Sequence, residues 1–178
     1  MDVNAIISKF YKEESNGKSI LIAHSELVAE KAVAIADAHP ELNIDKDFVR
    51  EASLLHDIGV FLCDAPGIGC YGSEPYIKHG VLGAELLRRE GLERHARVCE
   101  RHTGAGLTKE SIIEQGLPLP AQDFLPETIE EKLVCFADKF FSKSRPTQEK
   151  SLEHARRSIA KFGEDSLRRF NEWCELFL

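Results

Sequence analysis

Residues 51–62 read EASLLHDIGVFL, a mostly apolar stretch that carries a histidine and an aspartate at its centre. Apolar residues recur there at helical spacing, and the pattern predicts a helix over about residues 46–61. Asp57 lies among these apolar residues, and a buried carboxylate must be paired, hydrogen-bonded or bound to a metal, because burying it alone is very costly. The stretch therefore predicts a helix that carries a polar pair into the interior of the protein.

The same helical spacing continues through most of the chain, with no convincing run of alternating β-branched and aromatic residues. We therefore expect an all-α protein with one compact domain over residues 1–178 and its metal-ligand core in about 20–145. Thr128 followed by Glu131 predicts a capping box at one helix start. The Gly- and Pro-rich connections, 62–75 and 103–127, are long, and we expect them to shape a binding pocket. The expected helices span about residues 3–13, 19–38, 46–61, 76–90, 93–103, 108–115, 128–145 and 147–176.

Composition and charge exclude several classes of protein. The chain has 178 residues and a formal net charge of −7. We expect no nucleic acid polymer as a partner, because phosphate backbones are bound by clustered Lys and Arg. No apolar stretch approaches the roughly 20 residues needed to cross a bilayer, so no membrane is expected. The start of the chain lacks the pattern of a secretion signal, and the five cysteines include no Cys-x-x-Cys pair; both features favour the cytoplasm.

Other polar residues share the setting of the central His-Asp pair. Three histidines and one aspartate lie in or beside apolar helical segments: His24, His79, His102 and Asp138. A single histidine in such a setting is more often a core residue with satisfied hydrogen bonds than a metal ligand. Six such groups cannot readily each find a separate hydrogen-bond or ion-pair partner. We therefore expect the helices to converge so that the six side chains share one or two cations. The remaining histidines lie among charged or small residues and are expected on the surface: His39, His95 and His154.

The types of these residues favour a divalent transition metal. His56 and Asp57 diverge by about 100° on a helix, so both can reach an ion in a groove between helices. His24 and Asp138 would complete a mixed shell of nitrogen and oxygen ligands. The remaining two histidines would hold a second ion, with Asp57 as the bridge. We expect one or two ions, with iron first and manganese, zinc, nickel, cobalt or magnesium as alternatives.

The ordered series His24, His56-Asp57, Asp138 resembles the signature of the HD superfamily of metal-dependent phosphohydrolases. The run His-Asp-Ile-Gly at 56–59 resembles its HDIG subgroup, and the resemblance extends over about residues 20–145. With all six candidate ligands, the chain is similar to the dinuclear branch, which includes dinucleoside tetraphosphate hydrolases and cyclic dinucleotide phosphodiesterases. It lacks the GYP motif of the latter. Many relatives also carry a lysine three residues after the aspartate; this chain has Val60 there, so their substrates are not assumed.

The resemblance implies hydrolysis of a phosphoester or phosphoanhydride of a small nucleotide-like molecule by a metal-activated water. In that reaction we expect Asp57, His79 and His102 to be the catalytic residues. Positive side chains near the ligands would hold phosphate oxygens. The candidates are Lys78, Arg101, Lys139 and Lys143, with Arg50 as a weaker one.

Two other functions stay open. HD-type diiron oxygenases, similar to myo-inositol oxygenase, share the six ligands but use oxygen, and a non-catalytic ligand-binding module is the other alternative.

Residues 67–72 read GIGCYG, which matches the G-x-G-x-x-G fingerprint of dinucleotide-binding sites. The context argues against such a site, because these residues follow a helical segment rather than a strand and Pro75 interrupts the helix that should begin there. The sequence leaves the particular substrate and the oligomeric state open.

Overall fold

The structure is a computed structural model and describes residues 1–145 and 148–178. Helices dominate it, which confirms the expected all-α class. Its α-helices are α1 (Val3–Phe10), α2 (Asn16–Ala38), α3 (Lys46–Leu55), α4 (His79–Arg89), α5 (Glu93–Arg101), α6 (Lys109–Glu114), α7 (Ile129–Asp138), α8 (Leu152–Ala160) and α9 (Glu164–Phe177). Its short 3-10 helices are η1 (Pro40–Leu42), η2 (Ile58–Leu62), η3 (Pro66–Ile68) and η4 (Tyr76–Lys78). Strands β1 (Asp64–Ala65) and β2 (Cys70–Tyr71) form an antiparallel hairpin.

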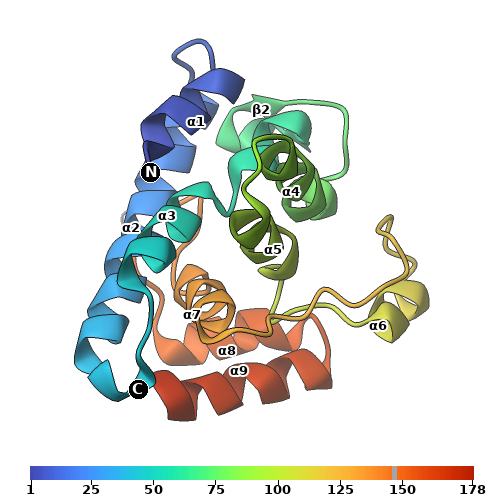
Figure 1. The fold of residues 1–178 in the computed structure, drawn as a ribbon. Coiled ribbons are helices and arrows are strands. Elements are labelled where there is room, and N and C mark those ends of the chain that lie inside the picture. The colour runs from blue at the N-terminus through green and yellow to red at the C-terminus, as the bar shows by residue number, and fades with distance from the viewer. Residues whose placement is uncertain (146–147) are drawn as a thin grey trace.

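Helix α7 lies in the middle of the helical assembly (Figure 1). Helices α2 and α3 pack side by side against it, α4 packs on α5, and α9 lies along another side of α7. One buried apolar cluster joins α2, α3, α7, α8 and α9, and a second lies among α1, η2, α4 and α5. Across the described ranges, no helix combines the length and the apolar character needed to span a membrane.

The start of α7 forms as predicted. The Thr128 hydroxyl accepts from the Glu131 amide at 3.2 Å, and the Glu131 carboxylate accepts from the Thr128 amide at 3.4 Å, which confirms the capping box. Glu131 also accepts from the Arg97 guanidinium on α5 at 2.7 Å. The buried Glu131 carboxylate thus caps the start of α7 and links this helix to α5 through Arg97.

We expect Glu131→Ala to lower the free energy of unfolding by about 1–3 kcal/mol, because it removes a cap and the buried carboxylate that accepts from the Arg97 guanidinium. The Glu131 side chain is only 3% exposed, whereas that of Arg97 is 29% exposed, so water replaces part of the lost contact. Urea unfolding followed by circular dichroism measures the change. Glu172→Ala, on the exposed face of α9, is the control and should stay within about 0.5 kcal/mol. Equal losses in both variants would contradict this account of the cap.

The helix expected over 46–61 is interrupted at its functional end. Helix α3 ends at Leu55, and a 3-10 turn begins at Ile58. In a continued helix the Ser53 carbonyl would accept from the Asp57 amide; here it accepts from His56 Nδ1 at 2.6 Å. Asp57 takes φ −109° and ψ 11°, which departs from helical geometry. The side-chain bond and the break orient the His-Asp pair.

Three further expected helices were too long. The helix expected over 3–13 ends at Phe10, and that over 128–145 ends at Asp138, after which the amide of Phe140 bonds three residues back to Ala137 at 3.2 Å. The single helix expected over 147–176 is wrong, because Gly163 has φ 102° and separates α8 from α9. Its expected first residue, 147, lies outside the described residues.

Candidate metal centre

Six buried side chains converge from five helices and the turns that follow them. His24 lies in the middle of α2, whereas the others lie at or just beyond a helix end: His56 and Asp57 after α3, His79 at the start of α4, His102 after α5, and Asp138 at the end of α7. Each is at most 9% exposed. Three helices therefore end at the cluster, and the carbonyl end of a helix favours a positive charge.

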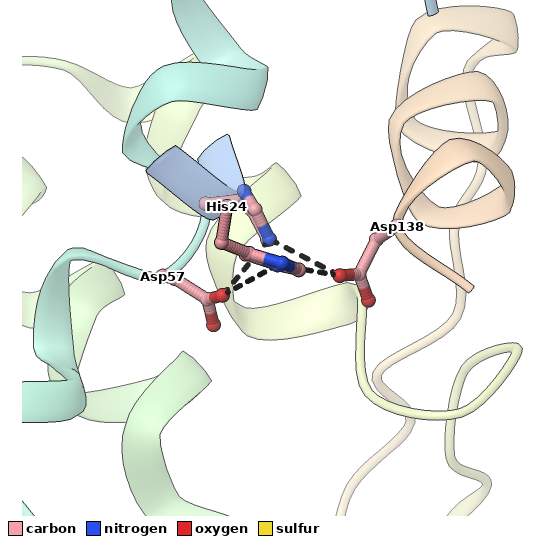
Figure 2. A group of neighbouring side chains, drawn as sticks. His24, Asp57 and Asp138 are labelled. Atoms are coloured by element: carbon pink, nitrogen blue, oxygen red, sulfur yellow. Dashed lines mark hydrogen bonds and ion pairs between the residues drawn. The ribbon is translucent and has the colours of Figure 1, made fainter. Parts of the chain in front are cut away.

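The first group of the cluster joins two histidines and two aspartates (Figure 2). His24 Nε2 lies 3.2 Å from Asp57 Oδ2 and 3.0 Å from Asp138 Oδ1. His56 Nε2 lies 3.1 Å and 3.4 Å from the same two oxygens. Four donor atoms of a kind that binds divalent transition metals thus lie together.

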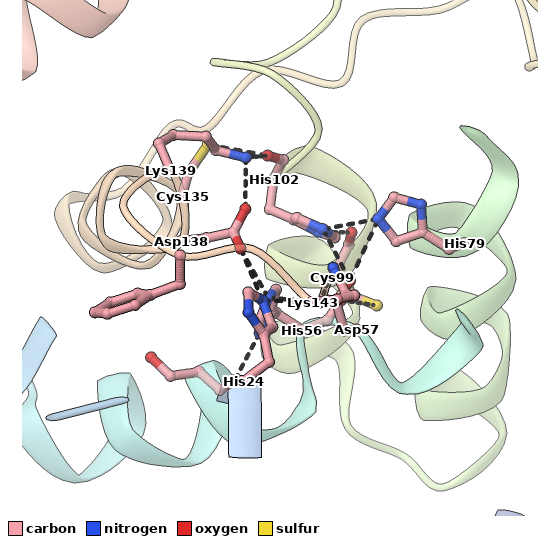
Figure 3. A network of polar contacts seen from close by, with 12 residues as sticks. His24, His56, Asp57, His79, Cys99, His102, Cys135, Asp138, Lys139 and Lys143 are labelled. Carbon is pink, nitrogen blue, oxygen red and sulfur yellow. Dashed lines mark hydrogen bonds and ion pairs between the residues drawn. The ribbon is translucent and has the colours of Figure 1, made fainter. Parts of the chain in front are cut away.

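The second group uses the other oxygen of the same aspartate (Figure 3). Asp57 Oδ1 lies 3.3 Å from His79 Nε2 and 3.4 Å from His102 Nε2. The two histidine nitrogens lie 3.0 Å apart. Because Asp57 offers Oδ2 to one group and Oδ1 to the other, it is placed as a bridge between them.

Three of the four histidine rings are oriented by a hydrogen bond to the backbone, as metal-ligating rings usually are. His56, His79 and His102 donate Nδ1–H to the backbone carbonyls of Ser53, Tyr76 and Cys99 at 2.6, 2.7 and 2.6 Å. When such a ring is neutral, its lone pair is on Nε2, toward the cluster. Burial lowers the pKa of His56, but Asp57 and Asp138 outweigh this and raise it to about 9, so a metal ion would displace a proton from this ring. Burial lowers the pKa of His79 to about 3 and also lowers that of His102. Two neutral rings whose lone pairs face each other at 3.0 Å fit a cation that both can bind.

The aspartates are held in the charged form that a metal requires. Burial by itself raises the pKa of Asp57, but His56 and Lys143 reverse this and hold that pKa well below its usual range. Both Asp57 oxygens and His56 Nε2 are buried and lie within ion-pair distance of their neighbours, but within the described residues none of the three atoms makes a hydrogen bond of good geometry. Buried polar atoms of this kind call for a ligand, so the residues present fit a divalent metal.

The predicted phosphate contacts separate into two kinds. Lys143 Nζ lies 2.5 Å from Asp57 Oδ2, and Lys139 Nζ lies 2.6 Å from Asp138 Oδ2. Lys78 pairs with Glu74 at 2.7 Å instead. Arg101 pairs with Glu127 at 2.9 Å, and Arg50 lines a different pocket beside residues 1–4. Of the five predicted candidates, the structure brings Lys139 and Lys143 to the cluster. Val60, which stands where the resemblance in sequence would place a lysine, is buried.

A pocket of about 390 Å³ opens beside the first group and is bordered by His24, Asp138, Lys139 and Lys143. The 62–75 connection contributes Ala65, Gly67 and Ile68 to its wall. A smaller pocket of about 200 Å³ reaches the second group and includes Thr103 and Gly104 of the other long connection.

Sequence reasoning missed several side chains of these walls, among them Tyr76, Lys150 and Phe162. The Tyr76 ring stacks on that of His79 with centroids 4.7 Å apart. Tyr76 precedes His79 by three residues, about one helical turn, and this spacing could have predicted that the two rings lie on the same side. Phe162 comes from the turn between α8 and α9, and no local pattern connects it with the distant ligands.

The fold and the site together define a class of protein: an all-α domain built around a buried His and Asp cluster suited to divalent metal. The family model of the HD domain matches residues 21–142, and the chain belongs to the HD domain family. The structure superposes on the HD domain of the L. monocytogenes phosphodiesterase PgpH with a TM-score of 0.56, over 93% of each chain. At 15% sequence identity this likeness concerns the fold alone.

Longer relatives share much of the sequence. A protein of Picrophilus torridus named tRNA (cytidine(56)-2'-O)-methyltransferase is 38% identical over 79% of this chain and 37% of its own length. One of the same name from Thermoplasma volcanium is 37% identical over 79% of this chain and 40% of its own length. An uncharacterised protein of Methanocaldococcus jannaschii is 45% identical over 66% and 61% of the two lengths. The chain thus spans between 37% and 61% of the length of these relatives.

Proposed function

We propose that this chain is a metal-dependent phosphohydrolase that acts on a small phosphorylated molecule. The observation that carries the proposal is the shared Asp57, whose two oxygens face two histidine-containing groups. Its six expected ligands are His24, His56, Asp57, His79, His102 and Asp138. Two adjacent divalent ions are a common arrangement in enzymes that cleave phosphate esters.

When bound, divalent ions offset phosphate charge and lower the pKa of a water so that it can attack phosphorus. The protein supplies ionised aspartates and oriented imidazoles for these ions. Lys143 and Lys139 line the adjoining pocket, where their ammonium groups would hold the phosphate oxygens. Tyr76 and Phe162, on the pocket wall, would cover the rest of the substrate and limit the access of water.

The size of the pocket supports a small substrate. A volume of about 390 Å³ falls within the range of small-molecule sites. Two relatives carry names that mention tRNA, but each of those proteins is more than twice as long as the part this chain matches. The chain's net charge of −7 also disfavours binding to a phosphate backbone.

Metal analysis and substrate screening test the proposal together. Protein purified without chelator should contain about two transition-metal ions per chain, and it should release phosphate from phosphoesters or anhydrides without oxygen. Products formed only in air would instead assign an oxygenase. Cleavage of tRNA but of no small phosphoester would overturn the substrate class. Failure to bind iron or manganese after reconstitution would leave a ligand-binding module.

Among the lysines, we expect Lys143→Met to lower kcat/KM for a phosphomonoester by about 10- to 100-fold at saturating Mn²⁺. The substitution removes a charge that lies 2.5 Å from Asp57 and also lines the pocket. Lys78→Met removes a charge that pairs with Glu74, so its kcat/KM should change less than about 3-fold. Steady-state kinetics on both variants decide the assignment, and equal losses would remove Lys143 from the phosphate site.

A further inference from the structure

The loop that follows α5 is packed against the C-terminal helices. Residues 102–107, which we call the His102 loop, leave α5 toward the side of the fold that α8 and α9 form (Figure 1). Gly104 and Gly106 take φ values of 61° and 85°. A Cβ on Gly104 would lie 3.0 Å from the Phe162 ring and 3.3 Å from Ser166 Oγ. The loop therefore has little freedom to shift toward α9.

Two side chains of α9 hold the backbone of this loop. Arg169 donates from Nε to the Ala105 carbonyl and from Nη2 to the Gly106 carbonyl, both at 2.9 Å. Ser166 Oγ, in a residue only 1% exposed, accepts from the Ala105 amide at 3.0 Å. The guanidinium can hold two successive carbonyls because its donors form a rigid planar fork, which a lysine lacks.

Helix α7 holds the start of the same loop from the other side. Lys139 Nζ donates to the His102 carbonyl at 2.7 Å (Figure 3), and Cys135 Sγ donates to the same carbonyl at 3.3 Å. His102 Nε2 in turn lies 3.4 Å from Asp57 Oδ1. The contacts of α9 thus act three and four residues along the chain from a candidate ligand of the second group.

We propose that Arg169 and Ser166 are positioning residues that hold the His102 loop so that His102 points at the second ion. The inference rests on the proposed two-ion centre. It extends the site to α9, which lies beyond the residues 21–142 that match the HD domain. Loosening the loop selectively weakens the group that contains His79 and His102. The group of His24, His56 and Asp138 has no ligand on the loop and keeps its affinity.

The test titrates the chelator-treated full chain with Mn²⁺ alone, by calorimetry. Arg169→Met should weaken one of the two binding sites by about 10- to 100-fold, the range found for residues that orient metal ligands, and leave the other within about 2-fold. Arg168→Met is the matched control, because its side chain is 67% exposed and pairs with Asp165; its isotherm should match the unaltered chain. Ser166→Ala replaces Arg169→Met if the latter does not fold.

Each outcome has a separate meaning. If Arg169→Met weakens both sites equally, or leaves the isotherm unchanged, the positioning role is wrong. In that case, binding of two Mn²⁺ ions by the unaltered chain would still support the proposed metal centre. An unaltered chain that binds no Mn²⁺, and no iron on reconstitution, overturns the proposed function itself. Hydrogen exchange on the metal-free protein gives an independent readout: amides 103–107 should exchange at least about 10-fold faster in Arg169→Met than in Arg168→Met.

Discussion

Asp57→Asn is expected to reduce the number of bound metal ions from about two per chain to none and to lower phosphoester hydrolysis by about 1,000-fold or more. Among the residues that the structure describes, Asp57 is the one side chain that belongs to both candidate groups. Asparagine keeps its shape but replaces one carboxylate oxygen with an amide nitrogen that cannot bind a cation, and it removes the negative charge. Elemental analysis after dialysis measures the first effect, and phosphate release measures the second.

Asp138→Asn is the matched variant for this prediction, because Asp138 belongs to the first group only. It should leave about one ion per chain, held by the second group. Far-UV circular dichroism should show that both proteins remain helical, since neither change alters side-chain volume. An Asp57→Asn protein that retains two ions would rule out the bridging role, and one that retains hydrolysis without metal would rule out the proposed mechanism.

The general fold could be predicted because the evidence for it is local. Apolar residues at helical spacing and a Thr128–Glu131 pair mark α7 without reference to the rest of the chain. The ends of the helices are less predictable, since they depend on particular contacts. At the end of α3 a histidine ring takes the Ser53 carbonyl, and between α8 and α9 Gly163 adopts a positive φ. Neither feature disturbs the apolar periodicity that was used to place the helices.

The candidate ligands could be selected because burial leaves few alternatives for charged groups in apolar segments. The residues of the pocket walls could not be predicted in this way, since a charged side chain next to a ligand in sequence need not point toward the same site. Arg101 directly precedes His102, about 100° away around a helix, and it contacts Glu127 and the Leu125 carbonyl. Lys143 lies 86 residues after Asp57 yet reaches its carboxylate at 2.5 Å. The tertiary fold brings the segment after α7 to Asp57, and no local pattern predicts that contact.

The glycine of the His-Asp-Ile-Gly run supports the second large prediction. A Cβ on Gly59 would lie 2.4 Å from the Gly83 amide nitrogen, 2.4 Å from the His79 carbonyl oxygen and 2.8 Å from the Gly83 Cα. All three atoms are backbone, so no side chain can rotate away to make room. Gly59 therefore permits the close approach of η2 to α4, the helix whose first residue is His79.

Gly59→Ala is expected to lower the free energy of unfolding by about 3 kcal/mol or more, because the two backbones must separate in a packed interior. Gly67→Ala is the control: Gly67 has no atom within 4 Å of an added Cβ, so its effect should stay within about 0.5 kcal/mol. Urea unfolding of the metal-free proteins measures both. If Gly59→Ala folds, the shift of α4 should also move His79 and weaken the second Mn²⁺ site. A Gly59→Ala protein as stable as Gly67→Ala would show that η2 and α4 do not approach this closely.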